Sequence, residues 1–233
     1  MDIVYVVKEC LECEELTYSL RSLVNIPHDK VFIVGGCPKN IDTSKVIHVP
    51  MLQIGSKYQN TTNMLKFICE KDIDLSEDFI LFNDDFFILK PIDLEDLNCC
   101  RGYVKDVIED YKSRCTMNDY IRGMEQTSIF LNDLGIKNAL SYELHIPIIL
   151  NKKNVLKMFS LPYLSSIGKV IHKRTLYGNL FLKNSKVIED VKVLVDRYVP
   201  IHSDKFLSCD DLSFARVKKF LNKLFPEKSE YEK

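Results

Sequence analysis

Short apolar runs alternate with segments of helical period along the first hundred residues. The runs at residues 2–7 (DIVYVV) and 30–36 (KVFIVGG) are typical of buried strands, the second closed by glycines. Between them, residues 14–26 place Leu16, Leu20 and Leu23 at helical spacing. A strand, a helix and a second strand over this length predict a βαβ unit, with a parallel strand pair and a right-handed crossover.

The same alternation continues and then changes character after Pro91. A third strand is predicted at residues 45–50, a helix at 56–71 and a fourth strand at 79–82 (FILF). Beyond Pro91 the pattern predicts mainly helices, at residues 104–111, 118–134, 155–159 and 210–225, interrupted by the apolar run at 144–150 (LHIPIIL). The sequence therefore predicts an α/β, Rossmann-like fold. Its mostly parallel sheet is flanked by helices, and its C-terminal part is helical.

An Asn-Asp-Asp triplet, Asn83 to Asp85, directly follows the predicted fourth strand and is flanked by large apolar residues. In open α/β sheets, ligands bind outside the carboxyl ends of the strands. Two carboxylates in an apolar run are costly to bury unless their charge is compensated. A Mg²⁺ or Mn²⁺ ion, a cationic partner and a turn exposed to water are the three explanations that the pattern leaves open.

Composition and charge narrow the function classes. The 233 residues are 46% hydrophobic and 28% charged, with a net charge of −1, so the protein is no polyelectrolyte. From residue 151 onward Lys and Arg outnumber Asp and Glu by roughly two to one, and solvated helix faces explain part of that excess. We expect eight reduced cysteines in a cytoplasmic protein without a membrane span, because no apolar run is long enough. The Cys10-x-x-Cys13 pair lacks a second pair for zinc.

Four segments in order, DIVYVV, EELTYSLRSL, KVFIVGGCP and EDFILFNDDFFILKPID, resemble the Stealth-type sugar and sugar-phosphate transferases and their short phage-encoded relatives. The agreement in order and spacing extends to ELHIPIILNKKNVL and covers residues 2–156. The resemblance implies a GT-A-like glycosyltransferase fold, forming one domain over residues 1–233. Residues 1–98 would be its nucleotide-sugar and metal half, and residues 99–233 its mostly helical acceptor half.

The resemblance also implies roles for individual positions. Asp84 and Asp85 would hold Mn²⁺ or Mg²⁺, with Asp85 acting in catalysis, while Asn83 orders the turn or touches the nucleotide. Arg21 would face the sugar-phosphate or brace the acidic pair. His145 would be a metal ligand or an acid/base group. Val6 would contact the nucleotide; there the chain has VVK where the family usually has Trp-Val-Asp.

The residues themselves leave alternatives at several of these positions. A histidine in the apolar run LHIPIIL is more often a core residue than a ligand, and His172 and His202 are weaker candidates. Lys57 and Asn63, near the start of a helix, could bind an anion or a base, although simple capping of that helix is an equal explanation. The stretch HKRTLYGN offers a diphosphate or acceptor clamp made of Lys173, Arg174, Tyr177 and Asn179.

Together these features predict a metal-dependent glycosyltransferase that moves a sugar from a nucleotide-diphosphate sugar to an acceptor hydroxyl. The acceptor would be a hydroxymethylated base in phage DNA or a surface glycan, and a phage-encoded enzyme would act in the host cytoplasm. The alternatives are a sugar-1-phosphate transferase of the Stealth type and a non-catalytic nucleotide-binding module. A P-loop ATPase is disfavoured because its phosphate-binding motif is missing.

Overall fold

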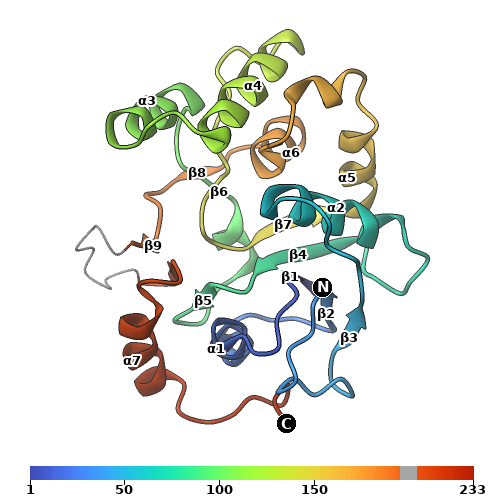
Figure 1. Cartoon of the computed structure of the whole chain (residues 1–233), viewed down its shortest axis with the longest axis vertical. Helices are drawn as coiled ribbons and strands as arrows, with labels where there is room; N and C mark the ends of the chain where they lie inside the picture. The colour runs from blue at the N-terminus through green and yellow to red at the C-terminus, as the bar shows by residue number, and fades with distance from the viewer. Residues whose placement is uncertain (195–203) are drawn as a thin grey trace.

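The computed structural model describes residues 1–194 and 204–233 (Figure 1), so His202 lies outside the described residues. Short 3₁₀ helices lie at Leu23–Asn25, Leu94–Leu97 and Leu164–Ile167. In chain order the other elements are β1 (Asp2–Val7), α1 (Glu14–Ser22), β2 (Val31–Gly35), β3 (Ile47–Val49), α2 (Lys57–Glu70), β4 (Asp78–Asn83), β5 (Phe86–Ile88), β6 (Cys99–Cys100), α3 (Val104–Arg114), α4 (Asp119–Asp133), β7 (Ile148–Asn151), α5 (Lys152–Phe159), α6 (Lys173–Phe181), β8 (Lys186–Val187), β9 (Lys192–Val193), β10 (Phe206–Cys209) and α7 (Phe214–Leu224).

The central sheet has five strands in the order β3-β2-β1-β4-β7. Its first four strands run parallel, and β7 joins the edge antiparallel to β4. Strand β1 lies in the middle, with Tyr5 paired to Ile33 of β2 on one side and to Phe82 of β4 on the other. This confirms the predicted α/β class with a mainly parallel sheet flanked by helices.

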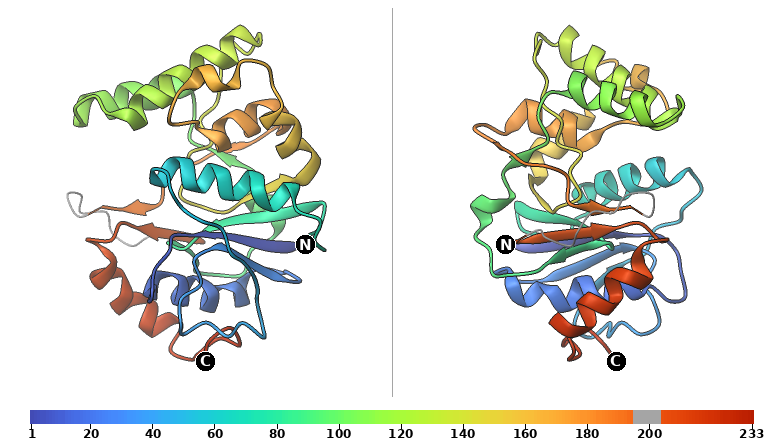
Figure 2. Two further views of the ribbon diagram at one scale, coloured as in Figure 1. Left: turned by 45° about the vertical axis from the view of Figure 1, so that its right-hand side comes forward. Right: turned by 90° about the vertical axis from the view of Figure 1, so that its left-hand side faces the viewer.

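Both faces of the sheet are apolar, and successive side chains of β1 divide between them. Val4 and Val6 belong to the core on the side of α2 and α5, whereas Ile3, Tyr5 and Val7 belong to the core on the side of α1. Figure 2 shows the sheet edge-on between these helical layers. The continuous apolar run thus forms a strand buried on both faces, because a period of two sends alternate residues to opposite sides.

A second, smaller sheet brings the C-terminal part of the chain to the end of β4. It has the order β5-β10-β9, with β10 antiparallel to β5 and parallel to β9. Ser208 of β10 pairs with Phe86 of β5 and with Lys192 of β9. Two polar side chains from distant segments therefore lie beside the turn that connects β4 to β5.

The predicted helical C-terminal part is more mixed than its pattern suggested. Helices α3, α4, α5 and α6 lie beyond the α2 face of the sheet, whereas α7 lies on the α1 side (Figures 1 and 2). Strands β7 to β10 were not predicted there, and the expected final helix begins only at Phe214, because residues 210–213 form a turn after β10. Short strands of two to four residues carry too little periodicity to be recognised. Within the described residues, no helix has the length and apolar character needed to cross a membrane.

Candidate functional site

The acidic pair forms the turn between β4 and β5, at the carboxyl edge of the parallel sheet. Strand β4 ends at Asn83, which pairs with Val6 near the end of β1, and β5 begins at Phe86. Asp84 and Asp85 are the two turn residues between them, and both are half-buried. The prediction that these acids end the fourth strand is therefore confirmed, and the turn does not lift them fully into water.

Asp85 is held by groups from the small sheet. Its Oδ2 atom accepts hydrogen bonds from Lys192 Nζ at 3.1 Å and from Ser208 Oγ at 3.0 Å. Burial alone would lower the pKa of Lys192, but the charge of Asp85 outweighs burial and the pKa is raised. Lys192 is therefore the cation that compensates Asp85.

Asp84 is less well compensated. Burial, and then the charge of neighbouring Asp85, raise the pKa of Asp84 to about 6. The ammonium group of Lys8 and a contact of 3.6 Å between Cys13 Sγ and Asp84 Oδ2 act in the opposite direction without cancelling the shift. Near neutral pH the turn therefore carries two adjacent negative charges that repel each other.

His145 lies close to the turn and forms a dyad with Asp190. The Nδ1 atom of His145 is 2.8 Å from one carboxylate oxygen of Asp190 and 3.0 Å from the other, and the His145 backbone N–H also donates to Asp190. Burial would raise the pKa of Asp190, but His145 and Arg101 hold it well below its ordinary value. Because an ionised carboxylate only accepts, Nδ1 is the protonated nitrogen, and Nε2 is the second nitrogen of the ring. The ring lies nearly perpendicular to that of Phe86, with 6.3 Å between the centroids.

Two cavities meet around this dyad. The larger holds about 880 Å³ and the smaller about 230 Å³. The two cavities share the lining residues Lys57, Tyr58, Tyr120, His145 and Lys192. His145 therefore borders both spaces, and a group bound in either one would approach its ring.

Solved structures with a similar course of the chain include sugar transferases. The galactosyltransferase LgtC, in complex with donor and acceptor sugar analogues, has a TM-score of 0.49 at 12% identity, over 98% of this chain and 96% of that one. An active-site mutant of LgtC scores 0.44 at 12% identity over 88% and 80% of the two chains. The glycosyltransferase GlyE of Streptococcus pneumoniae TIGR4 scores 0.40 at 12% identity, over 81% of this chain and 45% of that one. No protein-family model and no curated protein sequence matches the chain.

Four of the predicted substrate-binding residues, Lys173 of α6 among them, border the smaller cavity. Lys57 lies at the start of α2, Asn83 at the end of β4 and Arg174 in the first turn of α6. Asn63 does not join them, because it is exposed on α2 and lines neither cavity. Ser56 caps the same helix, so the amide at position 63 is not needed as a cap.

Arg21 was expected to face the sugar-phosphate or to brace the acidic pair, and the structure corrects this expectation. Its guanidinium forms a bidentate ion pair with Glu232, at 2.7 and 2.8 Å, and donates to the Phe225 carbonyl at 3.1 Å. Both side chains are largely buried, with 13% of Arg21 and 5% of Glu232 exposed. Arg21 therefore attaches the C-terminal segment to α1 and contributes nothing to the turn.

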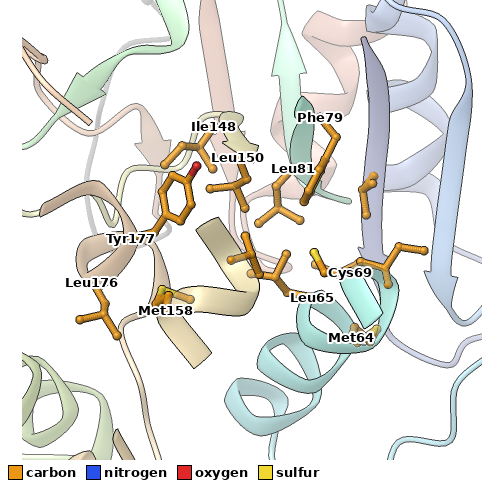
Figure 3. Packing of buried hydrophobic residues seen from close by; sticks show 14 of the residues in the cluster. Met64, Leu65, Cys69, Phe79, Leu81, Ile148, Leu150, Met158, Leu176 and Tyr177 are labelled. Carbon is orange, nitrogen blue, oxygen red and sulfur yellow. The ribbon is translucent and has the colours of Figure 1, made fainter. Parts of the chain in front are cut away.

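Three further predicted contacts are also corrected. The side chain of Val6 is 4% exposed and belongs to the sheet core, so it cannot reach a nucleotide. Tyr177 is 3% exposed and packs near Ile148 and Leu150 (Figure 3), while its hydroxyl accepts the Asn151 N–H. The remaining residue, Asn179, exchanges hydrogen bonds with the backbone of Leu140, which makes it a brace between two segments.

The sequence did not single out several residues that complete the site. Lys192 and Ser208 come from short strands, and Asp190 and Glu143 lie in loops. Only the general basic excess beyond residue 151 pointed towards Lys192. No local pattern marks a carboxylate that acts through a histidine 45 residues away, since that pairing depends on the tertiary fold.

The side chains near the turn can be compared with those that a Mn²⁺ or Mg²⁺ ion would require. Among residues 1–194 and 204–233, no group of three or more His, Cys, Asp or Glu side chains is arranged to hold a metal, so Asp84, Asp85 and His145 do not form a joint site. Two adjacent, mutually repelling carboxylates do fit a hard cation that takes two protein ligands and completes its shell with substrate phosphate and water. The role of His145 as a metal ligand stays a prediction, and Asp84 and Asp85 are kept as the candidate pair.

Proposed function

We propose that the protein is a metal-dependent glycosyltransferase that uses a nucleotide-diphosphate sugar. One observation carries the proposal: the acidic turn, the His145–Asp190 dyad and cation-lined cavities converge at the carboxyl edge of a mainly parallel sheet. The resemblance of the motifs to Stealth-type transferases and their phage-encoded relatives points to the same chemistry. Transfer between oxygens needs a charged leaving group, an acceptor base and positioning, and this edge offers residues for each.

The donor diphosphate would lie at the turn. Asp84 and Asp85 would hold Mn²⁺ or Mg²⁺, which neutralises charge developing on the leaving diphosphate. Lys192 would then share Asp85 with the cation, and the repulsion between the two carboxylates would be reduced. Asn83 is the last residue of β4 and directly precedes the acidic pair, so its amide can contact a donor bound at the turn.

His145 would act on the acceptor hydroxyl. Its Nε2 atom takes the proton as the acceptor oxygen bonds to the anomeric carbon and the bond from that carbon to the diphosphate oxygen breaks. Asp190 keeps Nδ1 protonated and stabilises the imidazolium that forms. In the sugar-phosphate alternative, the acceptor oxygen bonds instead to the phosphorus next to the sugar, and nucleoside monophosphate leaves.

The larger cavity suits the acceptor. The ring centroid of Tyr120 lies 5.7 Å from that of Tyr58 and 5.5 Å from that of Tyr111, and Arg101 and Arg114 lie over the Tyr111 ring. Aromatic faces bordered by guanidinium groups can stack on a nucleobase or on a sugar ring. A hydroxymethylated DNA base and a surface glycan are the two acceptors we propose. Binding to duplex DNA that weakens steeply with salt would identify the first, and its absence would exclude it.

The decisive test is a thermal-shift screen of nucleotide sugars with and without Mn²⁺. We expect one donor to raise the melting temperature only when metal is present, and we expect Asp84→Asn and Asp85→Asn to abolish that shift. Asp133→Asn, which removes an exposed acid from α4, is the matched control and should respond like the wild type. A complete screen without metal-dependent stabilisation would refute the proposal.

Product analysis separates the two transfer schemes. Release of a nucleoside diphosphate establishes glycosyl transfer, whereas release of the monophosphate establishes transfer of the sugar with its phosphate. A protein that binds the donor yet releases neither product with any acceptor would be a nucleotide-binding module. Isotope-labelled donor followed by chromatography of the nucleotide measures all three outcomes.

A further inference from the structure

The smaller cavity has an unusual charge balance. Four cationic side chains line it, those of Lys57, Lys173, Arg174 and Lys192, against the single carboxylate of Glu143. Neither Asp84 nor Asp85 lines this space, although Asn83 does. The cavity therefore lies next to the acidic turn but presents the opposite charge.

Among the residues that the structure describes, most of these cations donate their hydrogen bonds to neutral oxygens rather than to a carboxylate. Lys192 is bound to Asp85, but Lys173 Nζ donates to the Thr61 hydroxyl at 3.0 Å, and Arg174 Nη2 donates to the Ile146 carbonyl at 2.6 Å. Both of these acceptors are neutral. Among the residues that the structure describes, none of Lys57, Lys173 and Arg174 forms a salt bridge.

Glu143 does not neutralise these groups fully. One of its oxygens accepts the backbone N–H of Thr175 at 3.1 Å, in the first turn of α6, and lies 3.8 Å from His172 Nδ1. One carboxylate, already satisfied by a helix N-terminus, faces two or more cations. The balance of charge in the cavity is therefore positive.

The unmet hydrogen-bonding capacity points in the same direction. Arg174 is only 8% exposed, and its Nε atom is buried without a hydrogen-bond partner in the described structure. Burial lowers the pKa of Arg174, and it lowers the pKa of Lys173 to about 8. A buried cation is costly unless an anion pairs with it, so these side chains are arranged for a charge that a ligand brings.

We propose that the smaller cavity is an anion subsite that binds a phosphate group carried by the acceptor, separate from the diphosphate site at the Asp84–Asp85 turn. About 230 Å³ is below the roughly 300–1,000 Å³ of pockets that enclose whole drug-sized ligands, so it fits a substituent. Guanidinium and ammonium groups are the usual partners of phosphate oxygens. His145 borders this cavity, so a phosphate held there brings the rest of the acceptor to Nε2.

The assignment of the phosphate to an acceptor rests on the proposed function. The binding of phosphate in the cavity does not depend on it. The first experiment therefore titrates inorganic phosphate into metal-free protein without any donor and follows binding by calorimetry. We expect Lys57→Met, Lys173→Met and Arg174→Gln each to weaken binding roughly 10-fold to 100-fold, as loss of a charge-assisted hydrogen bond does. Lys66→Met, on the same helix as Lys57 but outside the cavity, should bind like the wild type.

The variants keep the test decisive. Arg174→Gln loses the bond to the Ile146 carbonyl and could unfold, whereas Lys57 is exposed at the start of α2 and its replacement leaves the core intact. If phosphate does not bind the wild type, or binds Lys57→Met and Lys173→Met as tightly as the wild type, the subsite does not exist. A folded Asp84→Asn protein that binds phosphate normally separates this cavity from the turn.

A second experiment identifies the molecule that carries the phosphate. Sugar phosphates and nucleoside monophosphates are offered as acceptors to the enzyme with its donor and metal. Arg174→Lys and Lys57→Met should then raise the KM for the phosphorylated acceptor while leaving the KM for the donor unchanged. Phosphate binding without any transfer to phosphorylated acceptors would overturn the acceptor assignment but not the anion site, and a donor that fails to bind would count against the proposed function alone.

Discussion

The acidic turn and the smaller cavity lie side by side and handle buried charge differently. At the turn, Asp85 is compensated by Lys192 from β9, and Asp84 is compensated only in part by Lys8. In the cavity, Lys173 and Arg174 donate hydrogen bonds to neutral oxygens, and the one carboxylate of the lining, that of Glu143, faces both of them. Each region thus keeps one kind of charge without a full partner. Residual charges of opposite sign at adjacent places indicate a site built for a ligand rather than for the stability of the empty protein.

The largest expected effect on activity concerns His145, which lies between the acidic turn and the smaller cavity. We expect His145→Ala to lower kcat about 10²-fold to 10⁴-fold, the range associated with loss of a general base. Asp190→Asn should also lower kcat with little change in KM, because it removes the group that orients the ring, and Asp190→Glu should restore part of the activity. Steady-state kinetics at saturating donor provide the measurement.

Glu189→Gln is the matched control, since this neighbouring acid lines the larger cavity but does not bond to His145. It should keep nearly the full kcat. If Asp190→Asn raised KM and left kcat unchanged, the dyad would be a binding feature and the catalytic role of His145 would be wrong.

The sequence was most informative where local pattern and burial coincide. The run DIVYVV forms β1, and FILF forms the centre of β4. A continuous apolar run of this length indicates a strand that is buried on both faces. The carboxyl end of β4 could be identified as a site because strand direction follows from the βαβ unit. Strands β9 and β10 could not be identified, since both are short. Strand β10 is specified by pairing with β5 across more than a hundred residues, and β9 by pairing with β10.

Individual roles were harder to predict than the location of the site. Arg174 was identified as a cation near the site, yet Tyr177 and Asn179 in the same stretch face the core and a backbone segment. Arg174 and Tyr177 are three residues apart and share a face of α6, so they differ because the first turn of the helix borders the cavity and the next turn packs on the core. Arg21 shows a related problem, because its place in the sequence does not indicate which carboxylate the tertiary fold brings to it.

Arg21 differs from the charges of the site, because it is a largely buried cation with a carboxylate partner, Glu232. We expect Arg21→Ala to lower the free energy of unfolding by about 3 kcal/mol, because it leaves Glu232 buried without its partner. Donor affinity should stay unchanged, since Arg21 does not contact the turn. Chemical denaturation and donor titration test the two statements.

Arg122→Ala is a suitable comparison, because Arg122 is exposed on α4 and its ion pair with Asp119 lies in solvent. That variant should lose less than about 1 kcal/mol. A change in donor affinity in folded Arg21→Ala protein would restore the role in the site that the structure removes.

The smallest effect concerns Asp84, whose charge is the least compensated in the turn. Replacing Asp84 should raise the free energy of unfolding near neutral pH, whereas replacing Arg21 should lower it. In the folded protein the pKa of Asp84 is raised from 3.8 to about 6, first by burial and then by Asp85. Between these values the folded state holds a proton that the unfolded chain has lost. The contribution of Asp84 to the stability of the metal-free protein should therefore fall as the pH rises from about 4 to 6, and this contribution should not recover at higher pH.

Asp84→Asn removes this titration and the repulsion from Asp85. The free energy of unfolding of the variant minus that of the wild type should be larger at pH 7.5 than at pH 4.5 by about 1–3 kcal/mol. Chemical denaturation in the absence of metal measures this difference. Asp133→Asn should show no such pH-dependent difference, because that acid is exposed. A variant that gains stability while losing metal-dependent donor binding would show that the turn keeps its charge for the ligand. Equal differences at both pH values would mean that Lys8 and Lys192 already neutralise the pair, and the contrast with the cationic cavity would then disappear.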